Sequence, residues 1–157
     1  MCDTELISLE NLKKSKWDRR FIELASHISY WSKDPSTKVG SVIVNEKNHI
    51  LSVGYNGFPS GVEDSPLRYS DRDTKLKYVC HAERNALDNA HSDVSNCTLY
   101  ATLMPCNECA KSIIQRGIKR VVCYVPDPSR DGASFNWDVT KSMFEEAGIQ
   151  LDMVDLV

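Results

Sequence analysis

Cys106 and Cys109 form a Cys-x-x-Cys pair whose spacing suits metal binding. On the first turn of a helix, this spacing puts both sulfurs on one side. The start of a helix also favours thiolates, and the thiolate is the form of cysteine that binds a metal ion. The same pair could be a redox motif or half of a structural zinc site, so its interpretation depends on a further ligand.

His81 supplies a third ligand. Two thiolates and one imidazole leave a tetrahedral zinc ion with one open position, which holds water, whereas a structural site closes with a fourth protein ligand. Candidates for that fourth ligand are Cys80, Cys97, Cys123 and His91. Glu83 favours the open site, because an acid beside a ligand can accept a proton from water whose pKa the zinc ion has lowered. We therefore predict a hydrolytic zinc centre with His81, Cys106 and Cys109 as metal ligands and Glu83 as the catalytic residue.

The two-residue spacing of His81 and Glu83 sets a condition on the local structure. Side chains two positions apart on a helix do not face each other. His81 must therefore lie at the very start of its helix if Glu83 is to reach the same water.

The elements that would position these residues are helices and strands in alternation. Large apolar residues at steps of three and four predict a helix over residues 15–33, with Ser15 and Asp18 spaced like a capping box. Stretches rich in β-branched residues predict a hairpin of two strands over 39–45 and 48–55. The remaining helices and strands are expected to alternate over residues 81–90, 97–102, 105–117, 118–125, 136–147 and the residues after Gly148.

Alternation of this kind predicts an α/β fold with helices on both faces of one sheet. The 126–148 segment is long enough for a crossover helix, so the last two strands should be parallel. A single domain over residues 1–157, with a core over about 15–155, accounts for the whole length. Residues 56–78 form a long connection, and such connections are usually functional or disordered.

The composition argues against several classes of protein. The chain has 19 basic and 22 acidic residues, a net charge of −3, and no run of lysine or arginine longer than two, so no nucleic-acid partner is expected. No apolar run approaches the roughly 18 residues of a membrane span. The acidic N-terminus is unlike a secretory signal, which predicts a cytoplasmic protein whose six cysteines are thiols or metal ligands rather than disulfides.

The two motifs together resemble a known family. Residues 81–83 (His-Ala-Glu) and 105–109 (Pro-Cys-Asn-Glu-Cys) match the H-x-E…P-C-x-x-C pattern of the zinc nucleobase deaminases. Similarity to the deoxycytidylate (dCMP) deaminases extends through residues 34–40, 54–59, 78–83 and 102–110. The resemblance implies a three-layer α/β/α cytidine-deaminase-like fold with a mixed five-stranded sheet. It also implies the conversion of dCMP and water to dUMP and ammonia, with Glu83 moving protons beside the catalytic zinc ion.

The resemblance extends to substrate contacts. Asn56 occupies the place where related deaminases hold the sugar or base, although Asn-Gly is also a common turn pair. Ala82 is assigned to the substrate contacts as well, and Tyr124 either stacks on the pyrimidine or is a buried strand tyrosine. Basic residues that could bind the substrate phosphate, or be solvated surface charges, are Lys38, Arg84 and Arg130.

Members of this family are commonly homo-hexamers controlled by nucleotide triphosphates, with dCTP as activator and dTTP as inhibitor at a shared site assisted by Mg²⁺. The segment that matches the family motif for this effector site contains Tyr55, Asn56, Gly57, Phe58 and Gly61. The alternative is that its glycines and Pro59 only form turns.

Two other kinds of function remain open. One is a related deaminase that acts on free cytidine or on a tRNA adenosine, although the acidic balance disfavours tRNA and residues 55–59 resemble the dCMP group. The other is a zinc-stabilised nucleotide-binding regulatory module without catalysis. Glu83 distinguishes a catalytic from a structural centre, because a structural site has no use for an acid beside an open coordination position.

Overall fold

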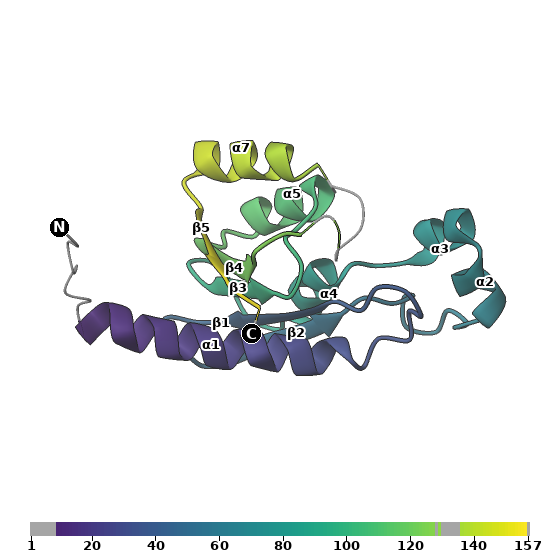
Figure 1. Ribbon diagram of the computed structural model, residues 1–157, viewed down its shortest axis with the longest axis horizontal. Coiled ribbons are helices and arrows are strands. Elements are labelled where there is room, and N and C mark those ends of the chain that lie inside the picture. Colours follow the sequence, from purple (N-terminus) through teal and green to yellow (C-terminus); the bar gives the residue numbers. More distant parts are fainter. Residues whose placement is uncertain (1–8, 128, 130–135, 157) are drawn as a thin grey trace.

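The computed structural model describes residues 9–127, 129 and 136–156, and their strands form one mixed sheet (Figure 1). The sheet order is β2-β1-β3-β4-β5. The strands are β1 (Gly40–Val44), β2 (Ile50–Tyr55), β3 (Thr98–Ala101), β4 (Arg120–Tyr124) and β5 (Gln150–Val154). β1 is antiparallel to β2 and β3, whereas β3, β4 and β5 are parallel to one another. The predicted hairpin and the predicted parallel pair at the C-terminal end are both confirmed.

Helices cover both faces of this sheet. α1 (Leu9–Ser29) lies along one face, and α4 (Ala82–Asn89), α5 (Asn107–Gln115) and α7 (Trp137–Ala147) lie on the other (Figure 1). Each interface has its own hydrophobic core: Ile22 of α1 packs with Val42 of β1, and Leu87 of α4 packs with Ile43 of β1. The expected three-layer α/β/α arrangement is therefore confirmed.

The strand β1 shows why the sequence specifies these layers. Successive residues of a strand point to opposite faces, so Val42 faces α1 while Ile43 faces α4 and α5. Both side chains are fully buried. Burial of a valine or isoleucine side chain contributes about 1.5–3 kcal/mol, so an uninterrupted apolar strand is stable only where both faces are covered.

The N-terminal helix differs from its predicted range. α1 spans Leu9–Ser29 rather than residues 15–33, so Ser15 and Asp18 lie inside it and the capping-box interpretation is wrong. The Asp18 carboxylate instead pairs with Arg120 of β4 at 2.6 Å and accepts a hydrogen bond from the hydroxyl of Tyr100 at 2.7 Å. Trp31, the last large apolar residue of the predicted range, follows the helix and is 52% exposed.

The long connection after β2 contains two short helices, α2 (Pro66–Ser70) and α3 (Arg72–Tyr78). We call residues 66–78 the α2–α3 arm, which stands to one side of the three layers (Figure 1). The Phe58 ring stacks on Tyr69 of the arm, with ring centres 4.1 Å apart and planes 7° apart. This stack ties the arm to the end of β2, so the connection is an ordered part of the fold.

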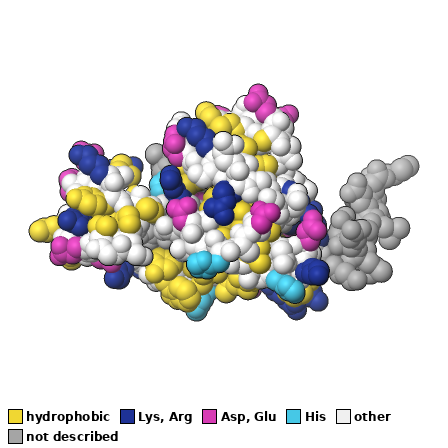
Figure 2. Space-filling view, turned by 180° about the vertical axis from the view of Figure 1, so that it is seen from behind, with side chains coloured by type: hydrophobic (Ala, Val, Ile, Leu, Met, Phe, Trp, Pro, Cys, Tyr) yellow, Lys and Arg dark blue, Asp and Glu magenta, His cyan; other side chains and the backbone are white. Residues whose placement is uncertain are grey.

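The surface carries both signs of charge. Figure 2 shows lysine and arginine side chains interspersed with acidic ones on the face turned away from the viewer of Figure 1, without an extended basic stripe. Among the described residues, none of the helices is both long enough and apolar enough to cross a membrane.

Candidate active site

His81 lies at the boundary between the α2–α3 arm and α4. It is the N-cap of α4, with φ −72° and ψ 155°, which is extended rather than helical backbone. Its neighbour Cys80 is held by two backbone hydrogen bonds to Gly57, of 3.1 and 2.8 Å. Glu83 is in the first turn of α4 and is buried. The structure therefore meets the condition that His81 precede the regular turns of its helix.

A close approach between α4 and β2 fixes the position of this helix. A Cβ atom added to Gly54 would lie 2.4 Å from the backbone nitrogen of Ala86 and 2.5 Å from the backbone oxygen of Ala82. Only glycine allows β2 and α4 to pack at this distance. The Ser52 hydroxyl also donates a 2.6 Å hydrogen bond to the Ala86 carbonyl.

The two cysteines lie at the start of α5. Cys106 is the N-cap, and its sulfur accepts a hydrogen bond from the backbone N–H of Cys109. The helix thus begins after Cys106 rather than at Pro105. α7 anchors the preceding segment, because Trp137 donates from its ring N–H to the Met104 carbonyl (3.2 Å) and the Thr140 hydroxyl donates to the Pro105 carbonyl (3.0 Å).

The three predicted ligands meet in space. The Nδ1 atom of His81 is 3.4 Å from the sulfur of Cys106 and 3.3 Å from that of Cys109. In a tetrahedral site with ~2.3 Å Zn–S and ~2.05 Å Zn–N bonds, nitrogen and sulfur lie roughly 3.6 Å apart. The ligand atoms all lie within 4.8 Å of one another, so this donor set fits a zinc ion.

The cysteines interact strongly with each other. The hydrogen bond from the Cys109 thiol lowers the pKa of Cys106 to about 4, with a further contribution from His81. The same hydrogen bond, together with burial, raises the pKa of Cys109. The thiolate, which is the form that binds a metal ion, is therefore favoured at Cys106.

The Glu83 carboxyl lies close to the three ligand residues and is shielded from water. Its side chain is only 4% exposed. Burial raises the pKa of the Glu83 carboxyl, while the charge of His81 opposes this shift. The carboxyl therefore takes up a proton more readily than an exposed glutamate does.

His81, Glu83 and Cys106 line one cavity of about 200 Å³. Its other walls come from the chain before β1, the end of β2, α3 and the residues after β3. The residues that line it there are Asp34, Ser36, Thr37, Val39, Asn56, Arg72, Lys75, Leu76, Val79, Ala82, Leu103 and Met104. A small molecule that enters this cavity would meet His81, Cys106 and the buried carboxyl, and Cys109 lies directly beside them.

Comparison with known proteins assigns this site to a family. Residues 15–125 match the family model of the cytidine and deoxycytidylate deaminase zinc-binding region. The chain belongs to this deaminase family. It is 44% identical to the deoxycytidylate deaminase of Mus musculus over 140 residues, which is 85% of this chain and 77% of the mouse protein. An uncharacterized deaminase in the luxG 3′ region of Aliivibrio fischeri is 42% identical over 146 residues, or 90% of this chain and 96% of the relative.

A solved structure is also similar. The dCMP deaminase of cyanophage S-TIM5, in complex with dCMP and dUMP, superposes with a TM-score of 0.68 at 26% identity, covering 88% of this chain and 97% of the phage protein. The cytidine-deaminase-like fold expected from the sequence is thereby confirmed.

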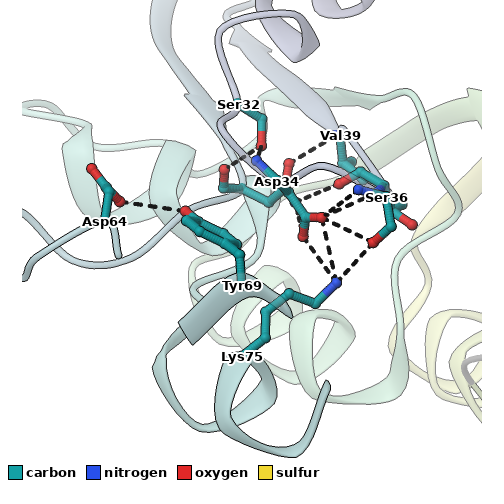
Figure 3. A network of polar contacts seen from close by, with 9 residues as sticks. Ser32, Asp34, Ser36, Val39, Asp64, Tyr69 and Lys75 are labelled. Carbon is teal, nitrogen blue, oxygen red and sulfur yellow. Dashed lines mark hydrogen bonds and ion pairs between the residues drawn. The ribbon is translucent and has the colours of Figure 1, made fainter. Parts of the chain in front are cut away.

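Asn56 lies in the wall of the cavity that His81, Glu83 and Cys106 line, which we call the deaminase cavity, and its amide is hydrogen-bonded to protein. Its oxygen accepts from the Val39 backbone N–H at 2.8 Å, and its nitrogen donates to the Thr37 carbonyl at 2.8 Å. Figure 3 shows the neighbouring part of this network, in which Lys75 of α3 reaches Asp34 and Ser36. Asn56 thus shapes the wall that a substrate would meet.

The other predicted substrate residues are distributed differently. Ala82 is buried and lines the deaminase cavity. Lys38 and Tyr124 line a neighbouring hollow instead, and the Tyr124 hydroxyl is 2.9 Å from that of Ser26. This placement favours the alternative of a buried strand tyrosine. Arg84 is exposed and pairs with Asp88 at 3.8 Å, and Arg130 lies outside the described residues.

The predicted effector segment adjoins the same cavity. Tyr55 ends β2 with 41% of its surface exposed, Gly57 pairs with Cys80, and Phe58 stacks on the α2–α3 arm. Gly61 has a φ of +84° with open space around it, as expected for a turn.

Two basic residues of the cavity, Arg72 and Lys75, were absent from the predictions. Both belong to α3, which lies within the long connection over residues 56–78. A signal was present, because Asp71 is a favourable N-cap residue and Ser65-Pro66 is a typical helix start. Recognition of these caps would have predicted the two helices.

Proposed function

We propose that this deaminase hydrolyses dCMP to dUMP and ammonia. The observation that carries the proposal is one cavity whose wall contains a buried carboxyl, cationic side chains and two residues of the three-ligand metal cluster. The names of the mouse and cyanophage relatives support the choice of substrate.

The ligand set assigns the metal-binding roles. His81 would bind a zinc ion through Nδ1, and Cys106 and Cys109 through their sulfurs. When bound there, zinc supplies an activated water at neutral pH, because it lowers the pKa of a water at its open position.

Glu83 carries the proton transfers. It accepts a proton from water as the C4–O bond forms, and it delivers this proton to N3 of the cytosine ring. Glu83 then transfers the second proton of the water to the amine as the C4–N bond breaks, and ammonia leaves. Glu83 ends in its starting form, and the atoms balance as dCMP plus water giving dUMP plus ammonia. Its burial limits its contact with bulk water.

A comparison of substrates tests this proposal. The zinc-loaded protein would be given dCMP, deoxycytidine, cytidine and a tRNA with a target adenosine, and release of ammonia would be measured. We expect the highest kcat/KM for dCMP. A higher value for cytidine or for the tRNA would assign the chain to one of the related activities, and no turnover of any of them at full zinc occupancy would favour the non-catalytic module.

We further propose control by dCTP as activator and dTTP as inhibitor, with Mg²⁺, in a homo-hexamer. The position of the 55–61 segment supports coupling, since the backbone of Gly57 is hydrogen-bonded to Cys80, next to His81. Exposed aromatic rings support self-association: Trp31 lies between His27 and Tyr55, with ring centres 6.0 and 6.1 Å away. A dCMP rate curve that is hyperbolic and unchanged by either triphosphate would reject the control, and light scattering at the mass of a monomer would reject the hexamer.

A further inference from the structure

The cationic side chains that line the deaminase cavity, Arg72 and Lys75, both come from α3. The acidic side chains of the lining are Asp34 and Glu83. A substrate with a phosphate group needs a cation that is not already neutralised by the protein. The contacts of the two α3 residues decide which one is available.

The ammonium group of Lys75 is already paired with other residues of the protein. Its ammonium is 3.2 Å from Asp34 and donates a 3.0 Å hydrogen bond to the hydroxyl of Ser36 (Figure 3). The side chain of Lys75 is 12% exposed and that of Asp34 is 3% exposed, so this pair is largely shielded from water. Lys75 therefore joins α3 to the 34–39 segment, and its charge is balanced by Asp34.

Arg72 has no such partner. Within the part of the chain that the structure describes, its guanidinium makes no ion pair and no hydrogen bond. It is exposed at the wall of the cavity. A guanidinium presents a planar fork of donors that matches two oxygens of a phosphate.

The path of α3 separates Arg72 from the metal centre. Arg72, Leu76 and Val79 all line the cavity, and their spacing places them on one side of the chain that leads to His81. At ~1.5 Å per residue, α3 carries Arg72 roughly 9 Å from Tyr78. Because Arg72 and Glu83 line the same cavity, a ligand that fills it would meet both the buried carboxyl and an unpaired cation.

We propose that Arg72 selects the 5′-monophosphate of the substrate, with Lys75 as a positioning residue that fixes α3 through Asp34. This inference rests on the proposed deamination of a deoxynucleoside monophosphate and names the residue that discriminates it from the nucleoside. Arg72 binds the phosphate, while the pyrimidine extends toward Glu83.

The test compares Arg72→Ala with Lys77→Ala on two substrates. Lys77 is an exposed basic residue of the same helix that does not line the cavity, so its variant controls for net charge and helix content. We expect Arg72→Ala to lower kcat/KM for dCMP roughly 100-fold, mainly through KM, since charged hydrogen bonds to the phosphate are lost. The kcat/KM for deoxycytidine should change less than about twofold, and Arg72→Lys should recover only part of the loss because it lacks the fork.

A binding measurement separates this inference from the proposed reaction. Calorimetry should show that Arg72→Ala weakens binding of dUMP but not of deoxyuridine, whether or not the parent turns over dCMP. A parent protein that fails to deaminate dCMP refutes the proposed function. The role of Arg72 is refuted if kcat/KM of the Arg72→Ala variant falls equally for dCMP and deoxycytidine, or if the variant binds dUMP as tightly as the parent.

Discussion

The side chain of Asn56 holds the backbone of Val39, through a 2.8 Å hydrogen bond from the Val39 N–H to the Asn56 oxygen. The amide nitrogen of Asn56 donates in turn to the Thr37 carbonyl at 2.8 Å. Asn56 follows β2 and Val39 precedes β1, so one side chain joins the open ends of the hairpin. The segment held in this way forms a wall of the deaminase cavity.

Substitution of Asn56 by alanine should therefore lower the stability of the protein as well as its deaminase activity. Loss of these buried hydrogen bonds should lower the free energy of unfolding by about 2–4 kcal/mol, measured by urea denaturation at saturating zinc. The matched control is Asn45→Ala, because Asn45 accepts hydrogen bonds from Lys47 and His49 in an exposed turn. This substitution should lower the free energy of unfolding by about 1 kcal/mol or less. If the Asn56→Ala protein is as stable as the parent but binds substrate weakly, Asn56 contacts the substrate directly and does not hold the cavity wall.

Gly54→Ala tests the close packing that positions α4. The added methyl group would overlap the backbone of Ala82 and Ala86, so either β2 or α4 must move. We expect a loss of about 3 kcal/mol in the free energy of unfolding and weaker zinc binding, because His81 moves with α4. Gly57→Ala is the control: its nearest neighbour would be the Tyr69 hydroxyl at 3.9 Å, and stability should change by about 0.5 kcal/mol or less. Equal stability of the two variants would contradict the packing described here.

The Asp18–Arg120 pair predicts a particular response to acid. Burial of Asp18 opposes its ionisation, but hydrogen bonds from Arg120 and Tyr100 and the charge of Arg120 hold its pKa below the ordinary range. A carboxyl with a lowered pKa contributes stability above its ordinary pKa and loses that contribution as the pH falls through the lowered value. Asp18→Asn should therefore cost about 3 kcal/mol at neutral pH.

The difference between parent and Asp18→Asn should remain constant from neutral pH down to a pH of about 4 and shrink below it. Chemical denaturation at a series of pH values measures this difference. Glu108→Gln removes an exposed pair with Lys111 and should leave the free energy of unfolding unchanged. A difference that is independent of pH down to complete unfolding would show that Asp18 acts by packing and not by charge.

The sequence predicted those parts of the site that depend on local spacing. His81 and Glu83 are close in the chain, and Cys106 and Cys109 share one helical turn, so their chemistry could be read from residue types. The periodicity of apolar residues likewise predicted the order of most helices and strands. These features depend on the nearest turns of the chain.

Contacts between residues far apart in the chain could not be predicted from local spacing. Lys75 reaches Asp34 across 41 positions, and Asp18 reaches Arg120 across 102, so neither pair leaves a local pattern. Asp18 resembled a capping residue because its spacing from Ser15 was right, yet the tertiary pairing with Arg120 determined its role. Arg72 and Lys75 were missed as cavity residues for the same reason, since α3 lines the cavity only in the folded chain.

The most direct test of the proposed reaction is the rate of dUMP formation by the Glu83→Gln protein at full zinc occupancy. Metal analysis should give one zinc ion per chain for the parent, for Glu83→Gln and for Glu108→Gln, an exposed control acid between the two cysteines. We predict that the parent and Glu108→Gln release dUMP and ammonia from dCMP in equal amounts, and that Glu83→Gln loses about 10²–10⁴-fold in kcat. A Glu83→Gln protein that carries its zinc and deaminates dCMP as fast as the parent would contradict the proposal.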